Sequence, residues 1–428
     1  MAKFAMTAWP IDTHLTPFVA LARVLRARGH EVAFYTGPQA GPQLEREGFG
    51  WFPFKELDSA LAERNPGAQS NLKLGLRATR KMWNDFLLGS LPGQIADLER
   101  VCATWHPDAL ICDMTLWGPI LVLRETMRIP VAVLSHTAYC VLPGRENAAP
   151  GISLPPPRSA LGRLAARLIA RAMNAAGGIN RDANRVRAAH GLAPLEVTVT
   201  EYTGRMPLYL VPSAPELDYG RRDLPASVHY VGLCAPEDRE DHTAPKWTIR
   251  QQPGGAKRIV VLEEPHYAED PWLLRTAAAA MAGASAETIL VAGQGRNPAS
   301  LELGKLANNV RLEAWTPIEK AIASADLAIA HGNSETVLAA LGRGIPMVIL
   351  PRILEQPQIA WRLAASGAGI RVALKRATPR KFREAAEEVL RTPSYRQNAV
   401  RVAEALVRCG GPARAADLVA DLAGGLLR

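Results

Sequence analysis

One histidine stands where a proton acceptor would be useful. Residues 3–8, KFAMTA, read as a strand, and the loop WPIDTHL follows them. A helix is expected over residues 17–28, closed by Gly29, and the apolar run EVAFYTG is a second strand, so the chain opens with a βαβ unit. His14 lies in the loop, at the rim where ligands bind in such folds. Imidazole titrates near neutral pH and can take a hydroxyl proton, although His14 could also serve only as a hydrogen-bonding turn residue.

A carboxylate ends a later strand of the same half. Residues 108–117, DALICDMTLW, form a buried strand, and Asp113 is the only carboxylate at its end, because Asp108 lies at its start. A structural interpretation is that Asp113 caps a helix over residues 117–127. Asp12 stands close to His14 in sequence, but its side chain is expected to point away from the imidazole.

A polar turn in the second half has the features of a phosphate site. The apolar runs DLAIA and PMVIL each precede a polar turn and then a helix. The first turn is His331, Gly332, Asn333 and Ser334, and either Asn333 or Ser334 can cap the next helix. Such a turn, after a parallel strand, presents backbone N–H groups and the positive end of a helix dipole, which suit a phosphate or diphosphate. The second turn, 352–356, brings polar side chains to the same rim, and Trp315 could offer its indole face to a flat base.

These motifs resemble the nucleotide-sugar-binding cassette of GT-B glycosyltransferases, in the family of UDP-glycosyltransferases and bacterial macrolide and antibiotic glycosyltransferases. The positions that match the family pattern are Trp315, Pro317, His331, Gly332, Thr336, Gly344, Pro346, Pro351 and Gln356. The positions that depart from it are Ile318, Asn333, Glu335, Ala339 and Glu355. The resemblance extends over nearly the whole chain, and His14 with Pro17 fits a second family pattern in which Thr13 replaces a glycine.

The resemblance implies an α/β protein of the GT-B class, with two Rossmann-like domains facing a cleft. Residues 1–234 would bind the acceptor, and residues 258–409 would bind the nucleotide sugar. Residues 235–257, rich in proline, glycine and charge and without helical or strand periodicity, form the expected linker. Residues 410–428 would be a helix that returns toward the first domain.

The implied reaction is a single inverting displacement. A UDP- or dTDP-sugar would donate its sugar to a hydroxyl of a small, apolar natural product, with His14 as the general base and Asp113 holding the imidazole. The donor side would use Trp315 for the base, Glu355 and Gln356 for sugar hydroxyls, and the following residues for the phosphates: His331, Gly332, Asn333, Ser334 and Thr336. No metal or further cofactor is expected, because a helix dipole and His331 can meet the charge of the leaving group.

The acceptor side is less sharply indicated. In the family, irregular insertions such as those near residues 57–91 and 141–193 form the walls of the acceptor pocket. Apolar and aromatic residues there are Trp83, Phe86, Leu87, His136, Tyr139 and Met173. Each of them is also a good candidate for an ordinary core position.

Carboxylates at the expected phosphate site keep other functions open. Glu263 and Glu264 stand where the family has a small hydroxyl-bearing loop, and Glu335 stands in the cassette. A like-charge contact with a diphosphate at about 4 Å costs on the order of 1–4 kcal/mol. The carboxylates could point away, or Arg296 and Arg352 could offset them, or the site could be altered. A non-catalytic homologue that binds a ligand or partner, and a sugar-nucleotide epimerase on the same fold, are the two alternatives.

Composition sets the wider limits. The 428 residues suffice for two domains, and the five cysteines show no metal-binding spacing. The net charge of +9 is spread among acidic residues rather than gathered in a nucleic-acid-binding tract. Neither a signal peptide nor an apolar run of membrane-spanning length is recognisable, so a cytoplasmic monomer or homodimer without stable membrane insertion is expected.

Overall fold

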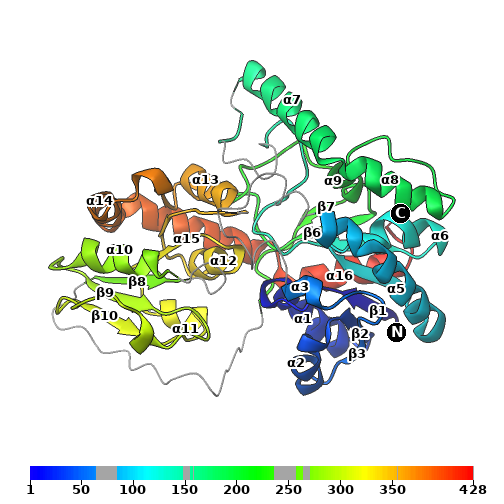
Figure 1. The fold of residues 1–428 in the computed structure, drawn as a ribbon, viewed down its shortest axis with the longest axis horizontal. Coiled ribbons are helices and arrows are strands. Elements are labelled where there is room, and N and C mark those ends of the chain that lie inside the picture. Colours follow the sequence, from blue (N-terminus) through cyan, green and yellow to red (C-terminus); the bar gives the residue numbers. More distant parts are fainter. Residues whose placement is uncertain are drawn as a thin grey trace.

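The computed structural model describes residues 1–63, 84–147, 155–157, 159–235, 257–263, 270–353 and 355–427. It contains two parallel sheets, which lie side by side in Figure 1. Their strands read as short, nearly continuous apolar runs, which is typical of parallel strands covered by helices on both faces. The two-domain α/β architecture predicted from the sequence is therefore confirmed.

The first sheet has the order β3-β2-β1-β4-β5-β6-β7, and every neighbouring pair is parallel. Its strands are β1 (Lys3–Thr7), β2 (Glu31–Thr36), β3 (Gly50–Pro53), β4 (Ala109–Asp113), β5 (Val131–Leu134), β6 (Leu208–Val211) and β7 (Val228–Tyr230). The strand order reverses between β1 and β4, where Thr7 pairs with Cys112. Ligands of open α/β sheets bind at such a reversal, beyond the carboxyl ends of the strands.

The second sheet repeats the plan with the order β10-β9-β8-β11-β12-β13. Its strands are β8 (Arg258–Leu262), β9 (Glu287–Val291), β10 (Val310–Glu313), β11 (Leu327–Ala330), β12 (Met347–Ile349) and β13 (Gly369–Arg371). Here the strand order reverses between β8 and β11. The residues after β11 therefore stand at the reversal point of the second sheet, where a ligand is expected to bind.

Helices cover both sheets. Those of the first half are α1 (Asp12–Ala27), η1 (Pro38–Ala40), α2 (Gly41–Arg46), α3 (Ala60–Glu63), η2 (Asp85–Gly89), α5 (Leu91–Trp105), η3 (Pro119–Leu123), α6 (Arg124–Thr126), α7 (Ala160–Gly177), α8 (Ile179–Ala189) and α9 (Val199–Thr203). Those of the second half are α10 (Trp272–Met281), η6 (Pro298–Ser300), α11 (Ile318–Ile322), α12 (Ser334–Gly342), α13 (Gln356–Ser366), η7 (Leu374–Arg376), α14 (Pro379–Arg391), α15 (Pro393–Arg408) and α16 (Gly411–Ala423). None of the helices within the described ranges is long and apolar enough to cross a bilayer.

The start of α1 differs from the prediction. The helix begins at Asp12, not near Pro17, because Ile11 is extended and Asp12 complements the positive end of the helix dipole. Pro17 is accommodated inside the helix, where it removes one backbone donor. His14 therefore lies in the first turn of α1 instead of the preceding loop, which fixes the position of its backbone. At the other end Gly29 has φ +83°, as expected for a helix-closing glycine.

Contacts at several places join the halves of the chain. The last helix, α16, packs in the same apolar core cluster as α1, and Arg28, directly after α1, pairs with Asp417 of α16 at 2.7 Å. At a second place, the fully buried Arg362 of α13 donates to Asp218 at 2.7 Å and stacks over Tyr139 at 3.9 Å. The exact domain boundaries stay a prediction, since residues 236–256 lie outside the described residues.

Candidate active site

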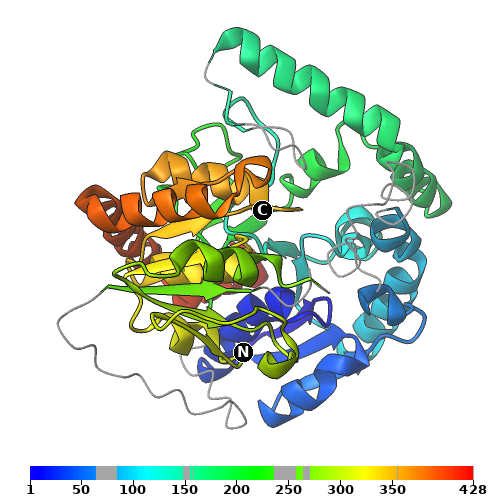
Figure 2. The same cartoon turned by 60° about the vertical axis from the view of Figure 1, so that its left-hand side comes forward.

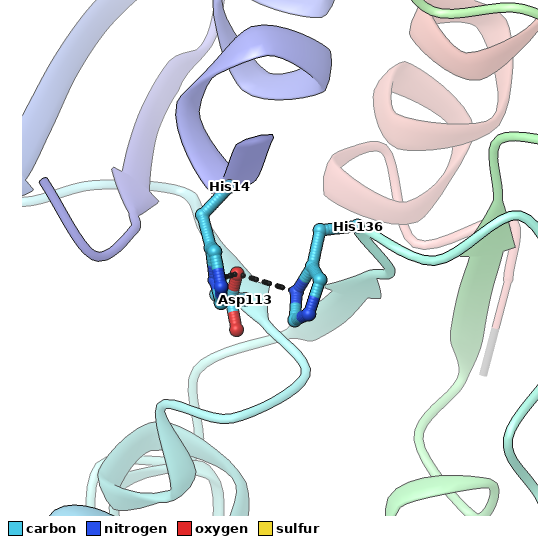
Figure 3. A group of neighbouring side chains, drawn as sticks. All are labelled: His14, Asp113 and His136. Carbon is cyan, nitrogen blue, oxygen red and sulfur yellow. Dashed lines mark hydrogen bonds and ion pairs between the residues drawn. The ribbon is translucent and has the colours of Figure 1, made fainter. Parts of the chain in front are cut away.

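Three side chains meet at the reversal point of the first sheet (Figure 3). His14 comes from the first turn of α1, Asp113 is the last residue of β4, and His136 stands two residues after β5. One carboxylate oxygen, Asp113 Oδ2, lies 2.7 Å from His14 Nδ1 and 3.1 Å from His136 Nδ1. The two imidazole rings lie against each other, with centroids 3.6 Å apart and planes inclined by 31°.

The second oxygen of Asp113 fixes the carboxylate in place. Asp113 Oδ1 accepts the backbone N–H of Thr115 at 2.8 Å and a short hydrogen bond from the Thr115 hydroxyl. An ionised carboxylate only accepts hydrogen bonds, so each histidine carries its proton on Nδ1. The Nε2 atoms of His14 and His136 are then the basic atoms of the two rings.

The electrostatics of the cluster separate the two histidines. Burial and then the charge of His136 lower the pKa of His14, although Asp113 opposes this. Burial also acts to lower the pKa of His136, but the charge and hydrogen bond of Asp113, helped by Glu355, outweigh it and raise that pKa. Burial acts to raise the pKa of Asp113, and the two imidazoles outweigh it, so this carboxyl stays ionised. His14 therefore loses its proton more readily than His136.

The contact between His14 and Asp113 is the one implied by the resemblance. Asp113 does not cap the following helix, because its two oxygens bond to Thr115 and to the two imidazoles, and the helix start has no side-chain cap. The contact between Asp113 and His136 was missed, because the sequence analysis assigned His136 to the acceptor pocket. Its position just after β5, at the same sheet edge as Asp113, is the signal that could have revealed it.

The rim of the second sheet is built differently. His331 follows β11 directly, donates Nδ1–H to the carbonyl of Leu350 at 3.0 Å, and stacks near Trp272 with ring centroids 6.3 Å apart. Burial, with the charge of Arg352, lowers the pKa of His331 to about 4, so the ring is neutral. Gly332 has φ +99°, and a Cβ there would lie 2.6 Å from Ile349, so both its conformation and its packing require glycine.

The polar side chains at the start of α12 hold protein backbone. Asn333 Oδ1 accepts the N–H of Thr336 at 2.8 Å and is the helix cap. Ser334 Oγ accepts the N–H of Ala138 at 3.0 Å, which links α12 to the first domain. Thr336 is buried. Of the two capping candidates in the sequence, Asn333 is the cap, and the predicted contacts of these side chains with phosphate stay a prediction.

The residues assigned to the sugar and the base follow two different strands of the second sheet, β12 and β10. Gln356 Oε1 accepts two backbone N–H groups, from Arg352 at 2.9 Å and Ile353 at 3.1 Å, and so closes the turn before α13. Glu355, beside it, is close enough to His136 for each to shift the pKa of the other, and burial is what raises the pKa of Glu355. Trp315 follows β10 and is partly exposed.

The carboxylates expected to repel a diphosphate, Glu263 and Glu335, have different surroundings. Glu263 is buried after β8, and Arg296 donates to it at 2.8 Å, so its charge is offset as the sequence analysis allowed. Glu335 is partly exposed in the first turn of α12. It lines a cavity of about 680 Å³ between the domains, together with Thr13 and His136 of the first domain. Glu264 lies outside the described residues.

Most of the described residues that were predicted to bind the acceptor are buried in the core of the protein. Phe86 stacks on Trp9 with centroids 4.3 Å apart, and Leu87 belongs to the same core cluster. Tyr139 lies beneath Arg362 at the junction of the domains. Trp83 and the side chain of Met173 lie outside the described residues. An acceptor-binding role for these residues stays a prediction.

Comparisons with known proteins agree over the whole chain. Residues 276–422 match the family model "Erythromycin biosynthesis protein CIII-like, C-terminal domain". The chain is 30% identical to 4'-demethylrebeccamycin synthase of Lentzea aerocolonigenes, over 98% of this chain and 99% of that protein. It is 26% identical to demethyllactenocin mycarosyltransferase of Streptomyces fradiae, over 99% and 87% of the respective chains.

Solved structures show the same fold. The glycotransferase of kitacinnamycin has a TM-score of 0.76 at 22% identity, covering 98% of this chain and 99% of that one. A spinosyn rhamnosyltransferase complexed with thymidine diphosphate has a TM-score of 0.68 at 20% identity, covering 98% and 100%.

Proposed function

The chain belongs to the GT-B natural-product glycosyltransferases, and from this premise we propose that it moves a sugar from a dTDP- or UDP-sugar to a hydroxyl of a small, apolar acceptor with inversion. The observation that carries the proposal is the 2.7 Å contact between His14 and Asp113, beside the cavity that α12 lines from the other domain. The spinosyn rhamnosyltransferase complexed with thymidine diphosphate supports the donor class.

In the proposed reaction His14 Nε2 takes the proton of the acceptor hydroxyl. The acceptor oxygen forms a bond to the anomeric carbon, while the bond from that carbon to the diphosphate oxygen breaks. The nucleoside diphosphate leaves with the electron pair, and attack from the opposite face inverts the anomeric centre. Asp113, hydrogen-bonded to Nδ1, stabilises the imidazolium that forms.

The leaving group would be met by backbone rather than by a metal. The first turn of α12 offers N–H groups and a positive dipole end, and the neutral His331 stands beside it after β11. Because Asn333 and Ser334 already hold backbone groups, the start of the helix is fixed before the nucleotide arrives. We propose that neither a metal nor a further cofactor takes part.

His136 would act as a positioning residue for the base. It shares Asp113 Oδ2 with His14, and because its pKa is raised while that of His14 is lowered, a proton on the pair would favour His136. His14 is then kept neutral and able to accept. Glu355, assigned to the sugar, faces His136 and would lie near the reacting carbon.

The test is a transfer screen. Purified protein is incubated with dTDP- and UDP-sugars and a panel of apolar hydroxylated acceptors, and products are detected by mass spectrometry, with His14→Ala as the control. A sugar adduct formed only by the protein with His14 supports the proposal. Equal product with His14→Ala, or binding of the donor without product from any acceptor, would contradict it.

A further inference from the structure

Helix α7 stands apart from the rest of the first domain. It spans 18 residues, which gives a rod of about 27 Å, and it projects from the body of the protein in both Figure 1 and Figure 2. It continues through Gly178 into α8 at one end. A helix in this position leaves most of its surface to the surroundings.

The apolar face of α7 is exposed. Leu161, Leu164 and Leu168 recur at spacings of three and four residues, so they share one face, and they are 77%, 53% and 55% exposed. Ile169 beside them is 36% exposed. Ten large apolar side chains are exposed in the described part of the chain, and four of them belong to this helix. Scattered exposed leucines are normal, but a continuous stripe over successive turns indicates an interaction surface.

A row of arginines flanks the leucine face of α7. Arg163, Arg167 and Arg171 repeat every four residues, and Arg167 and Arg171 each stand three residues after a leucine of that face, so the row runs alongside the leucines. None of these three arginines forms an ion pair with another described residue. From residue 147 to residue 181 the sequence contains five arginines and neither aspartate nor glutamate. The positive charge of the helix is therefore not offset by its own neighbours in sequence.

The leucine face and the arginine row together indicate which kind of partner would bind α7. A leucine face beside a row of arginines is the pattern of a helix that lies in the plane of a bilayer surface, with anionic headgroups against the basic row. A second copy of the helix fits less well, because its arginines would meet like charges and neither helix carries a carboxylate to offset them. A neutral apolar ligand would use the leucines but give no role to the arginines.

We propose that α7 docks the protein on an anionic lipid surface, with the leucine stripe at the acyl boundary and the arginines at the headgroups. The helix would lie on the membrane rather than cross it, in keeping with the finding on membrane-spanning helices above. The proposal stands independently of the transfer reaction, since lipid binding can be measured without either substrate.

The experiment is co-sedimentation of the whole protein with vesicles of phosphatidylcholine alone or mixed with phosphatidylglycerol. The wild type should partition onto the mixed vesicles at about 0.1 M salt and far less at about 1 M salt, because screening weakens the attraction. Replacing both arginines in Arg167→Gln/Arg171→Gln should lower the partition coefficient about fivefold for each. Leu164→Glu/Leu168→Glu should lower it by at least about tenfold.

Two matched controls separate this surface from general effects. Val407→Glu on α15 and Arg380→Gln on α14 change side chains that are 78% and 80% exposed, and both should bind like the wild type. Circular dichroism checks that every variant is folded. Absence of wild-type binding to the mixed vesicles, equal binding to both vesicle types, or equal losses in the controls would overturn the proposal. A concentration-dependent dimer that the Leu164→Glu/Leu168→Glu variant loses would assign the face to a second copy and overturn it as well.

Discussion

The two rims of the cleft use their polar side chains in opposite ways. At the first sheet, His14 and His136 both bond through Nδ1 to Asp113. This arrangement leaves the Nε2 atom of each ring directed away from the carboxylate. At the second sheet, Asn333 and Gln356 bond to nearby backbone and shape the turns that carry them. In the proposed reaction, the first rim moves a proton and the second rim presents backbone N–H groups to an anion.

This comparison predicts which substitutions affect which measurement. Changes in the first rim should alter rates and pH dependence with little effect on nucleotide affinity. Changes in the second rim should alter nucleotide affinity, because they alter the turns or the charge next to them. The predictions below run from the largest expected effect to the smallest.

Replacement of the base should have the largest effect. His14→Ala removes the proposed acceptor of the hydroxyl proton, so kcat/KM for transfer should fall by about 10²- to 10⁴-fold. Nucleotide affinity, measured by titration calorimetry, should stay within about twofold. A folded His14→Ala protein that transfers at the wild-type rate would remove the assignment of the base, and a large loss of nucleotide affinity would break the separation of the two rims.

Asp113→Asn should be milder than His14→Ala. The amide can still accept one hydrogen bond, but it carries no charge to stabilise the imidazolium and cannot hold both imidazoles in the same way. We expect a loss of about 10- to 100-fold in kcat/KM, measured with saturating donor. A thermal-melting comparison serves as the control, because Asp113 also closes the turn at Thr115. A loss larger than that of His14→Ala would indicate that this structural task dominates.

The positions of the strand ends could be predicted from the sequence, but the side-chain contacts made there could not. His14 and Asp113 stand at or after the ends of apolar strands of the first sheet, and parallel topology brings such ends to one edge, so their proximity could be predicted. His331 stands at the corresponding edge of the second sheet, and its role stays a prediction. Whether Asn333 or Ser334 caps α12 depends on rotamers, and the sequence left both open. The bond between Arg362 and Asp218 joins residues 144 positions apart, and no local pattern signals it. Helix α1 begins before the predicted start at Pro17, because a proline in the early part of a helix is tolerated and does not have to mark its first residue.

His136→Asn should shift a pH profile. The groups that face His136 are His14, Asp113 and Glu355. The positive charge of His136 helps lower the pKa of His14, so its removal should raise that pKa. The acid limb of kcat/KM should then move to higher pH, with the loss of rate confined to the acid side and small above about pH 8. His190→Asn, at the exposed end of α8, is the matched control. An equal loss at every pH would mean that His136 only supports the structure.

Glu335 should have the smallest effect. It is partly exposed, so water screens its repulsion of a diphosphate, and Glu335→Gln should tighten nucleotide binding by about twofold to fivefold. Glu335→Gly should do the same with a small cost in helix stability, and the pair separates charge from backbone effects. Weaker binding in both variants would indicate that Glu335 contributes favourably to the site.

The most direct test of the account is titration calorimetry of the wild-type protein with dTDP and UDP. Binding of at least one of them, retained in His14→Ala, is expected, because the capped start of α12 can hold a diphosphate despite Glu335. Absence of binding by either nucleotide at millimolar concentration would contradict the account and favour a donor site that the carboxylates have closed.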